Sequence, residues 1–146
     1  MHCVNLSNFR QRIQLINDTM LAFTRHSHQD KDRFGIAFAH LFQEANTIEV
    51  EPRLLLAVLL VENPWLEPAI RSPVGAVGLM QVMPFWKDEI GRPDDNLNRI
   101  DTNLRYGCTI LRYYLDRENG DVTRALARYN GSAPQLWYPQ RVYRAL

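Results

Sequence analysis

The chain has 146 residues, a formal net charge of +1 and 46% hydrophobic residues, which suits one globular domain with a sizeable core. The nearly balanced charge provides no basic field of the kind that nucleic-acid-binding domains carry, so we expect no nucleic-acid partner. No apolar run is long enough to span a bilayer, and residues 1–25 lack the continuous apolar segment of a signal peptide. The protein either acts where it is made or is exported by a segment outside this chain, and membrane contact is expected only through such a segment.

The first part of the chain predicts two helices separated by a polar break. Apolar residues recur at three- and four-residue spacing within residues 4–24, at Phe9, Ile13, Ile16 and Met20. The break at residues 26–30 contains His26 and His28, which are most simply loop residues, with a metal-binding pair as the alternative. A second amphipathic helix is expected from about residue 32 to residue 45.

A helix that is apolar nearly all round is expected from residue 52 to residue 62. Glu51-Pro52 marks its start, because proline is tolerated at the first helical position and an acidic residue there suits the helix dipole. A helix of this character belongs at the centre of a domain. It ends at Asn63-Pro64, since the residue before a proline disfavours the helical conformation.

The remainder of the chain predicts a loop and three further helices. Two glycines and two prolines bracket a short apolar segment in residues 71–84, which we interpret as a tight loop followed by one or two helical turns. Residues 85–99 look irregular. Helices are expected at residues 103–118, with Asp101 or Thr102 as the N-cap, at 122–129, ending at Asn130-Gly131, and at 140–146. The predicted class is therefore mainly α, with at most a minor irregular ribbon near residues 85–100.

The most unusual residue of the central helix is its last one. Leu54, Val58 and Glu62 lie at four-residue spacing and share one helix face, so Glu62 continues an apolar stripe. A carboxylate there is either the first polar residue past the buried part, or the ion-pair partner of an arginine, or a functional group. In the functional interpretation, partial desolvation raises its pKa, and the group can hold a proton near neutral pH and deliver it to a leaving oxygen.

Neutral hydrogen-bonding residues accompany this carboxylate, several with flat apolar bodies: Asn63, Trp65, Ser72, Gln81, Tyr129 and Asn130. Sugars stack their C–H faces on aromatic rings and hydrogen-bond through hydroxyl and acetamide groups. The set is therefore typical of a site for amide-bearing sugars, although any one of these residues alone is weak evidence.

The cysteines and arginines provide weaker evidence about function than the residues above. Cys3 and Cys108 form no metal motif or disulfide framework, and Cys108 is expected to be a small core residue. No metal or cofactor is expected. Arginines gather toward the C-terminus, at Arg112, Arg117, Arg124, Arg128, Arg141 and Arg144. We interpret them as solvated helix faces, with a weak attraction to an anionic polymer as the alternative.

Three blocks, in the expected order, resemble the lytic transglycosylases of the soluble-lytic-transglycosylase type. The first is Val61-Glu62-Asn63-Pro64, which ends the central helix. The second runs from Ser72 to Pro84 and contains Gly78-Leu79-Met80-Gln81, and the third is Ala127-Arg128-Tyr129-Asn130-Gly131. The second block is the specific one. The sequence departs from the family at Asn63, where a serine is usual, and at Gly131-Ser132, where alanine-glycine is commoner.

The resemblance implies a lysozyme-like helical domain with the catalytic glutamate at the end of a central buried helix. It covers roughly residues 34–146, so we expect the catalytic domain to span residues 30–146 and an N-terminal helix or stalk of unassigned role to span residues 1–29. The residues that the resemblance assigns to the site are the catalytic Glu62 and the substrate-binding Gln81, Tyr129, Ser72, Met80, Asn130 and Asn63.

The implied reaction splits the bond between N-acetylmuramic acid and N-acetylglucosamine in peptidoglycan without water. Glu62 would first protonate the glycosidic oxygen and would then accept the proton of the muramyl 6-hydroxyl, which closes a 1,6-anhydro ring. The implied partner is the peptidoglycan glycan strand, and the implied location is the periplasm or cell envelope, reached through an export or anchoring segment outside this chain. The oligomeric state is left open.

Two other functions remain possible from the sequence. A lysozyme-type hydrolase would need a second carboxylate across the cleft, for which Glu67, Asp88, Glu89 and Asp94 are the nearby candidates. A glycan-binding module that has lost turnover would keep the fold, and retention of Glu62 with Gln81 and Tyr129 argues against it.

Overall fold

The computed structural model describes residues 31–146, with side chains from residue 35 onward. Its helices are α2 (Lys31–Ile48), α3 (Pro52–Glu62), α4 (Trp86–Ile90), α5 (Ile100–Arg117), α6 (Val122–Asn130) and α7 (Trp137–Ala145). The described part of the chain has no strand and only two isolated bridges, so the mainly helical prediction is confirmed. The expected helix at 4–24, the break at 26–30 with its two histidines, and Cys3 lie outside the described residues.

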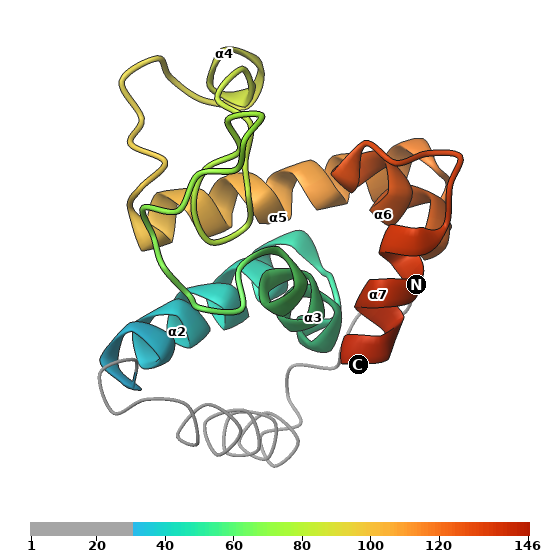
Figure 1. Ribbon diagram of the computed structural model, residues 1–146, viewed down its shortest axis with the longest axis horizontal. Helices are drawn as coiled ribbons and strands as arrows, with labels where there is room; N and C mark the ends of the chain where they lie inside the picture. Colours follow the sequence, from blue (N-terminus) through green and yellow to red (C-terminus); the bar gives the residue numbers. More distant parts are fainter. Residues whose placement is uncertain (1–30) are drawn as a thin grey trace.

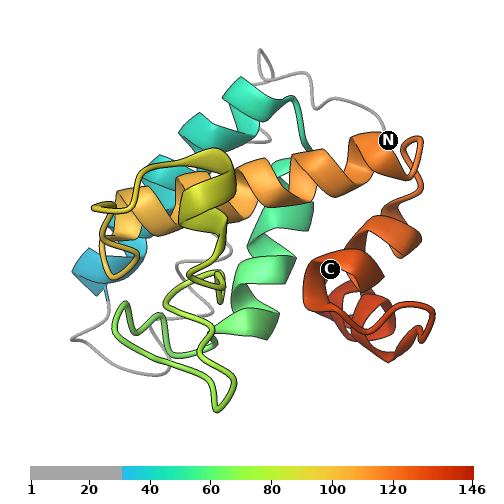
Figure 2. The ribbon, with the colours of Figure 1, turned by 90° about the horizontal axis from the view of Figure 1, so that it is seen from above.

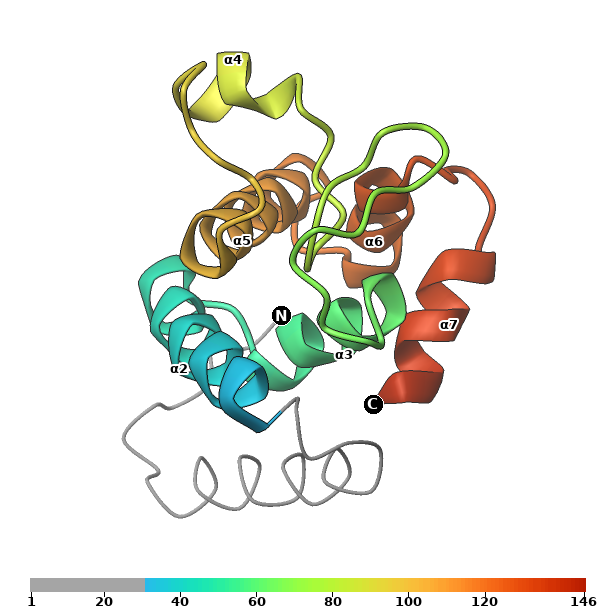
Figure 3. The ribbon, with the colours of Figure 1, turned by 60° about the vertical axis from the view of Figure 1, so that its left-hand side comes forward.

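Helix α3 occupies the centre of the fold, between α2 on one side and α7 on the other (Figure 1, Figure 3). The Glu51 carboxyl caps its first turn by accepting a hydrogen bond from the Arg53 amide at 3.2 Å, and Pro52 opens the helix. Residues 54–59 are all buried. An apolar helix is needed here because both of its long sides are covered, so the prediction from its all-apolar pattern is confirmed.

Helix α5 is the long helix of the other half and packs against α2 and α6 (Figure 2). It begins at Ile100, three residues before the expected start, and Arg99 occupies its N-cap position without a side-chain cap. The predicted capping role of Asp101 or Thr102 is therefore wrong, because both lie inside the first turn, where Asp101 pairs with Arg99 at 3.2 Å. Cys108 is fully buried on this helix, as predicted.

The C-terminal helices close the domain next to α3. Asp121 caps α6 by accepting from the Arg124 amide, and Gly131 ends it in the left-handed conformation (φ 84°), as its Asn-Gly terminus predicts. Helix α7 starts at Trp137 and not at residue 140, with Tyr138 and Pro139 in its first turn. The earlier start follows from the tolerance of proline within the first helical turn.

Residues 71–84 are not helical at any point, so the predicted helical turns are wrong. Gly75 (φ 94°), Gly78 (φ 75°) and Gln81 (φ 52°) adopt left-handed backbone angles, which a right-handed helix cannot contain. The segment instead folds back on itself through the bridges of Val77 with Arg71 and with Val82. The ribbon expected near residues 85–100 thus lies earlier in the chain, and residues 86–90 form the short helix α4.

None of the helices in residues 31–146 is long and apolar enough to cross a membrane. Over the same residues, no group of three or more His, Cys, Asp or Glu side chains is placed to hold a metal ion.

Candidate active site

The carboxyl group of Glu62 lies at the C-terminal end of α3 in a largely apolar environment. Burial raises its pKa from 4.5 to about 7, and a smaller opposing contribution comes from the Tyr138 hydroxyl. Its place at the negative end of the helix dipole acts in the same direction as burial. No ion pair with Glu62 occurs among residues 31–146, which removes the alternative of an arginine-paired carboxylate within the described part of the chain.

Tyr138, in the first turn of α7, faces Glu62 and was not singled out by the sequence patterns. It is 1% exposed, and its own pKa is raised, first by burial and then by the charge of Glu62. Its hydroxyl makes no hydrogen bond of standard geometry within the described residues. A buried hydroxyl without such a partner is uncommon, and here it leaves a polar group available to a carboxylate or to a bound ligand. No local pattern in the sequence marks it, because the packing of α7 against α3 brings it to Glu62.

Tyr129, from the end of α6, provides a second hydroxyl near the same carboxyl group. Its oxygen donates a hydrogen bond to the Met80 carbonyl at 2.7 Å. Burial raises its pKa far above the ordinary value, and the charges of Glu62 and Cys108 act in the same direction. The charge of Tyr129 in turn contributes to the raised pKa of Tyr138. Glu62, Tyr129 and Tyr138, from three different helices, therefore form one cluster.

The Gly78–Gln81 turn ties the loop of residues 71–84 to this cluster. The Gly78 amide donates to the Ile70 carbonyl at 2.7 Å, and a β-carbon at position 78 would lie 2.6 Å from Asn103 Nδ2. Glycine is therefore required at this position for both its backbone angle and its lack of a side chain. Gln81 is half-buried, and its Nε2 donates to the Gly78 carbonyl at 2.9 Å, which holds the side chain against the turn.

Asn103 fixes the same turn from α5 and was expected only to begin that helix. It is 1% exposed. Its Oδ1 accepts from the Met80 amide at 2.8 Å. Its Nδ2 donates to the carbonyls of Val77 and Leu97, both at 2.8 Å. A single buried amide thus satisfies three buried backbone groups that have no regular secondary structure to pair with.

Asn63 joins the end of α3 to the loop through its side chain, and its assignment to substrate binding stays a prediction. It is 1% exposed, and its Nδ2 donates to the carbonyls of Glu67 at 2.8 Å and Gly78 at 3.2 Å. Its Oδ1 accepts from the Glu67 amide at 3.2 Å. These backbone groups engage both ends of the side chain below the surface, so Asn63 holds the loop against the end of α3.

Met80 is likewise a buried residue, and its assignment to the substrate site also stays a prediction. Its side chain is fully buried and lies against α5 where that helix carries a glycine, since a β-carbon at Gly107 would lie 2.4 Å from the Met80 sulfur. Met80 therefore contributes packing, and its carbonyl anchors Tyr129. Ser72 is half-buried and its hydroxyl accepts from the Ala76 amide at 3.0 Å, whereas Asn130 is exposed at the end of α6.

The arrangement offers one protonatable carboxyl group and two tyrosine hydroxyls, with Gln81 held in the adjoining turn. The causes that shift the pKa of Glu62 include no other carboxylate. A carboxyl group that titrates near neutrality can both donate a proton and take one back. The cluster therefore suits acid-base chemistry that relies on one carboxyl group.

Replacing Tyr138 with phenylalanine is expected to raise the pKa of Glu62 further, because the hydroxyl that lowers it is lost. We expect the titration midpoint, followed by NMR of labelled glutamate side chains, to move up by about half a pH unit or more. Tyr143→Phe, on the same helix with a hydroxyl bound to Thr123, is the matched control. An unchanged midpoint in Tyr138→Phe would show that this tyrosine serves packing alone.

Comparisons with known proteins identify the family of the chain. The sequence matches the family described as the transglycosylase SLT domain over residues 40–144. A transglycosylase of Enterobacteria phage PRD1 is 38% identical over 86 residues, which are 59% of this chain and 31% of the phage protein. The soluble lytic murein transglycosylase of Escherichia coli K12 is 29% identical over 110 residues, which are 68% of this chain and 17% of that protein. The chain thus spans less than a third of the length of these relatives.

A solved structure has the same fold. An inactive variant of the lytic transglycosylase Slt from Pseudomonas aeruginosa superposes with a TM-score of 0.57 over 90% of this chain and 22% of its own, at 24% identity. This likeness confirms the lysozyme-like helical fold. The family match lies within the predicted catalytic domain of residues 30–146, whose boundary at residue 30 stays a prediction.

Proposed function

Because the chain belongs to the transglycosylase SLT family, we propose that it is a peptidoglycan lytic transglycosylase with Glu62 as its catalytic acid and base. It would cleave the β-1,4 bond between N-acetylmuramic acid and N-acetylglucosamine. The observation that carries the proposal is the half-buried Glu62 carboxyl group at the end of α3, whose pKa is raised to about 7 and which lies beside the hydroxyls of Tyr129 and Tyr138.

The proposed reaction uses this carboxyl group twice. Protonated Glu62 gives its proton to the glycosidic oxygen, and the bond from that oxygen to C1 of the muramyl residue breaks. The substrate's own acetamide stabilises the positive charge that develops at C1. Ionised Glu62 then takes the proton of the muramyl 6-hydroxyl, whose oxygen closes onto C1. The products are a free N-acetylglucosamine 4-hydroxyl and a 1,6-anhydromuramyl end, and Glu62 is again protonated.

The neighbouring residues would position the sugar and the acid. Tyr129 and Tyr138 approach the carboxyl group from α6 and α7. We propose that Gln81, Ser72 and Asn130 contact the sugar's hydroxyl and acetamide groups, because their polar side chains lie on the segments that flank α3. Gln81 and Ser72 already make one hydrogen bond each to the loop, which limits their rotation before a sugar binds.

A lysozyme-type hydrolysis is the second candidate, and the charges around Glu62 favour it less. It needs a second carboxylate facing the first across the sugar, roughly 5–9 Å away. None of Glu67, Asp88, Glu89 and Asp94 is among the groups that shift the pKa of Glu62. A single carboxyl group suits the anhydro-forming route, because the substrate supplies the nucleophile.

The decisive experiment is digestion of purified peptidoglycan sacculi, followed by mass spectrometry of the released fragments. Fragments that end in 1,6-anhydro-N-acetylmuramic acid, lighter by one water, are the expected result. Fragments with reducing ends would instead identify a hydrolase. Binding to sacculi with no release of fragments would identify a glycan-binding module and overturn the proposed activity.

The reaction is expected to slow as pH rises through the pKa of Glu62. The acid step needs the protonated form, so kcat/KM for glycan cleavage should be level below about pH 7 and should fall roughly tenfold for each pH unit well above it. Initial rates on soluble glycan fragments, measured at constant ionic strength from pH 5 to pH 9, give the midpoint. A fall that already begins near pH 5 would mean that the acid titrates near its ordinary value.

The proposed substrate places the site of action in the cell envelope. Peptidoglycan lies outside the cytoplasmic membrane, so the protein must reach the periplasmic side to act on it.

A further inference from the structure

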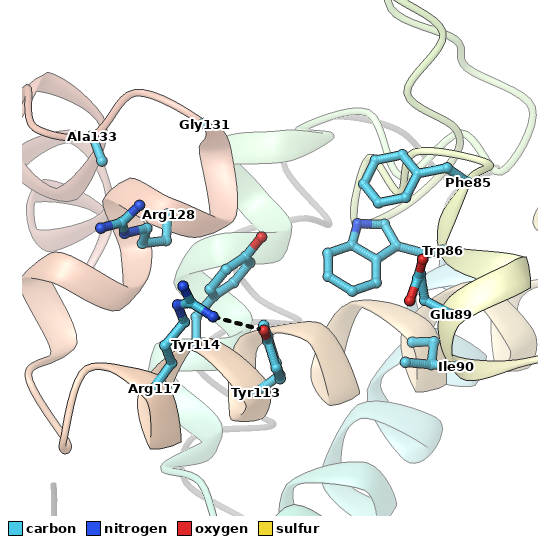
Figure 4. Close-up of a pocket in the computed structure, with 10 residues that line it drawn as sticks. All are labelled: Phe85, Trp86, Glu89, Ile90, Tyr113, Tyr114, Arg117, Arg128, Gly131 and Ala133. Carbon is cyan, nitrogen blue, oxygen red and sulfur yellow. Dashed lines mark hydrogen bonds between the residues drawn. The ribbon is translucent and has the colours of Figure 1, made fainter.

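A hollow lined by other residues than the Glu62 cluster has no part in the reaction described above. It is a cavity of about 600 Å³ between α4, α5 and the end of α6, large enough for a ligand of disaccharide size or more. Figure 4 shows its walls. Aromatic rings from α5 and from the start of α4 form one wall, and the guanidinium groups of Arg117, at the end of α5, and Arg128, on α6, lie opposite. The residues that define this aromatic–arginine pocket are Phe85, Trp86, Tyr113, Tyr114, Arg117 and Arg128.

The aromatic wall is a continuous cluster that stays accessible. The ring of Trp86 lies 5.0 Å from that of Phe85 and 6.1–6.2 Å from those of Tyr113 and Tyr114, measured between centroids. Phe85 is 53% exposed and Tyr113 45% exposed. Large rings left at the surface of a hollow provide flat apolar faces, which suit the C–H face of a sugar ring.

The two arginines provide positive charge at one end of the pocket. Arg117 is exposed, donates to the Tyr113 hydroxyl at 3.2 Å and makes no ion pair within residues 31–146. Arg128 is paired with Glu118 at 3.0 Å. Both guanidinium groups act on the Tyr114 hydroxyl. Among the described residues that line the pocket, the one acid is Glu89, which lies beside Trp86 across the pocket from the two arginines (Figure 4). An anion is therefore favoured at the arginine end.

Chain continuity places the pocket next to the candidate active site. Tyr129 and Asn130 lie between the pocket residues Arg128 and Gly131 on α6, and Phe85 follows Gln81 by four positions. The two segments that flank Glu62 thus continue directly into the pocket walls, so one polymeric ligand can occupy both.

We infer that the aromatic–arginine pocket binds a carboxylate-bearing amino sugar of the same glycan strand, with the sugar ring on the aromatic wall and its carboxylate at Arg117 and Arg128. The identity of the ligand rests on the proposed function. In peptidoglycan this carboxylate has two sources: the lactyl group of a peptide-free muramic acid, or the stem peptide attached to it. The chemistry recognised at the pocket is the same for both.

The test measures binding by calorimetry in the Glu62→Gln background, so that no ligand is consumed. Three tetrasaccharides are compared: a peptidoglycan fragment with its stem peptides, the same fragment after an amidase has removed the peptides, and neutral chitotetraose. Arg117→Gln is the test variant. Arg53→Gln, which removes a positive charge from the opposite end of α3, is the matched control. Phe85→Ala tests the aromatic wall.

We expect Arg117→Gln to weaken binding of the carboxylated fragments roughly three- to tenfold and to change chitotetraose binding less than twofold. A loss confined to the peptide-bearing fragment identifies the stem peptide, and a loss that persists without peptides identifies the lactyl carboxylate. Phe85→Ala should weaken all three ligands by about threefold or more, and Arg53→Gln none. Unchanged binding of the carboxylated fragments by Arg117→Gln would overturn the assignment, whatever the result for Phe85→Ala.

The outcome is independent of the sacculus digestion. If Arg117→Gln weakens binding of the carboxylated fragments while sacculi yield no anhydro fragments, the proposed reaction is wrong and the proposed ligand of the pocket is supported. If anhydro fragments form while Arg117→Gln binds normally, the reaction stands and the pocket assignment is wrong.

Discussion

Replacing Glu62 with glutamine is expected to reduce glycan cleavage roughly 1,000-fold or more, since one group is removed from both the acid step and the base step. Glutamine keeps the size of the side chain and its hydrogen-bonding capacity but carries no transferable proton. The rate of fragment release from sacculi measures the effect, with Asp94→Asn as a control that removes an exposed carboxylate from the loop before α5. Activity retained by Glu62→Gln would exclude Glu62 as the catalytic acid.

The stability of Glu62→Gln shows whether a loss of activity comes from the missing acid or from a damaged fold. The carboxyl group of Glu62 titrates near pH 7 in the folded protein and near pH 4.5 when exposed. The folded state therefore keeps the proton on Glu62 up to a higher pH than the unfolded state. As a result, the wild-type protein loses stability as pH rises from about 4.5 to 7. Above pH 7 the cost of the buried charge is fully present, whereas below pH 4.5 it is absent.

Glu62→Gln should therefore be more stable than the wild type at pH 8, by about 1–3 kcal/mol after allowance for partial exposure, and nearly equal to it at pH 4. Urea unfolding at the two pH values measures the difference. A variant that is inactive and more stable at pH 8 has lost catalysis through its chemistry, and one that is less stable at both values has lost its packing.

Replacing Asn103 with alanine is expected to destabilise the fold by about 3–5 kcal/mol. The Met80 amide and the carbonyls of Val77 and Leu97 would each lose a hydrogen bond in a buried place. Each such loss costs roughly 1–3 kcal/mol, and the chain can relax enough to recover only part of the total. Since a domain of this size is stable by about 5–15 kcal/mol, this is a large fraction.

Denaturant unfolding measures this loss, with Asn98→Ala as the matched control. Asn98 is exposed and its side chain makes one long contact, with Arg71 at 3.4 Å, so its loss should change stability by less than about 0.5 kcal/mol. Equal stabilities of the two variants would mean that the Gly78–Gln81 turn does not depend on Asn103. Activity should fall with the stability of Asn103→Ala, because the turn carries Gln81.

Much of the helical framework could be predicted from the sequence because its signals are local. The 3.6-residue periodicity that defines α2, the proline that opens α3 and the Asp121 and Gly131 caps of α6 act within a few residues of one another. The position of Glu62 follows from the same logic, since a carboxylate on an apolar helix face is visible in the sequence.

The helical turns predicted within residues 71–84 from local sequence patterns are wrong. The apolar segment of this loop has the composition of a helical turn, but the left-handed angles at Gly78 and Gln81 are held by contacts from outside the segment. Asn63 and Asn103, which supply those contacts, come from α3 and α5. The burial of Asn63 and Met80 could not be predicted for the same reason, because burial of a side chain depends on elements far along the chain.

Periodicity, capping and composition are properties of neighbouring residues, and they suffice to predict the fold class, the central helix and the acidic residue at its end. The surroundings of that acid depend on long-range packing. Packing of α7 against α3 brings Tyr138 to Glu62, and the burial that raises its pKa exists only in the assembled core. The aromatic–arginine pocket likewise forms only where α4, α5 and α6 meet, since long-range contacts leave no periodic pattern in a single sequence.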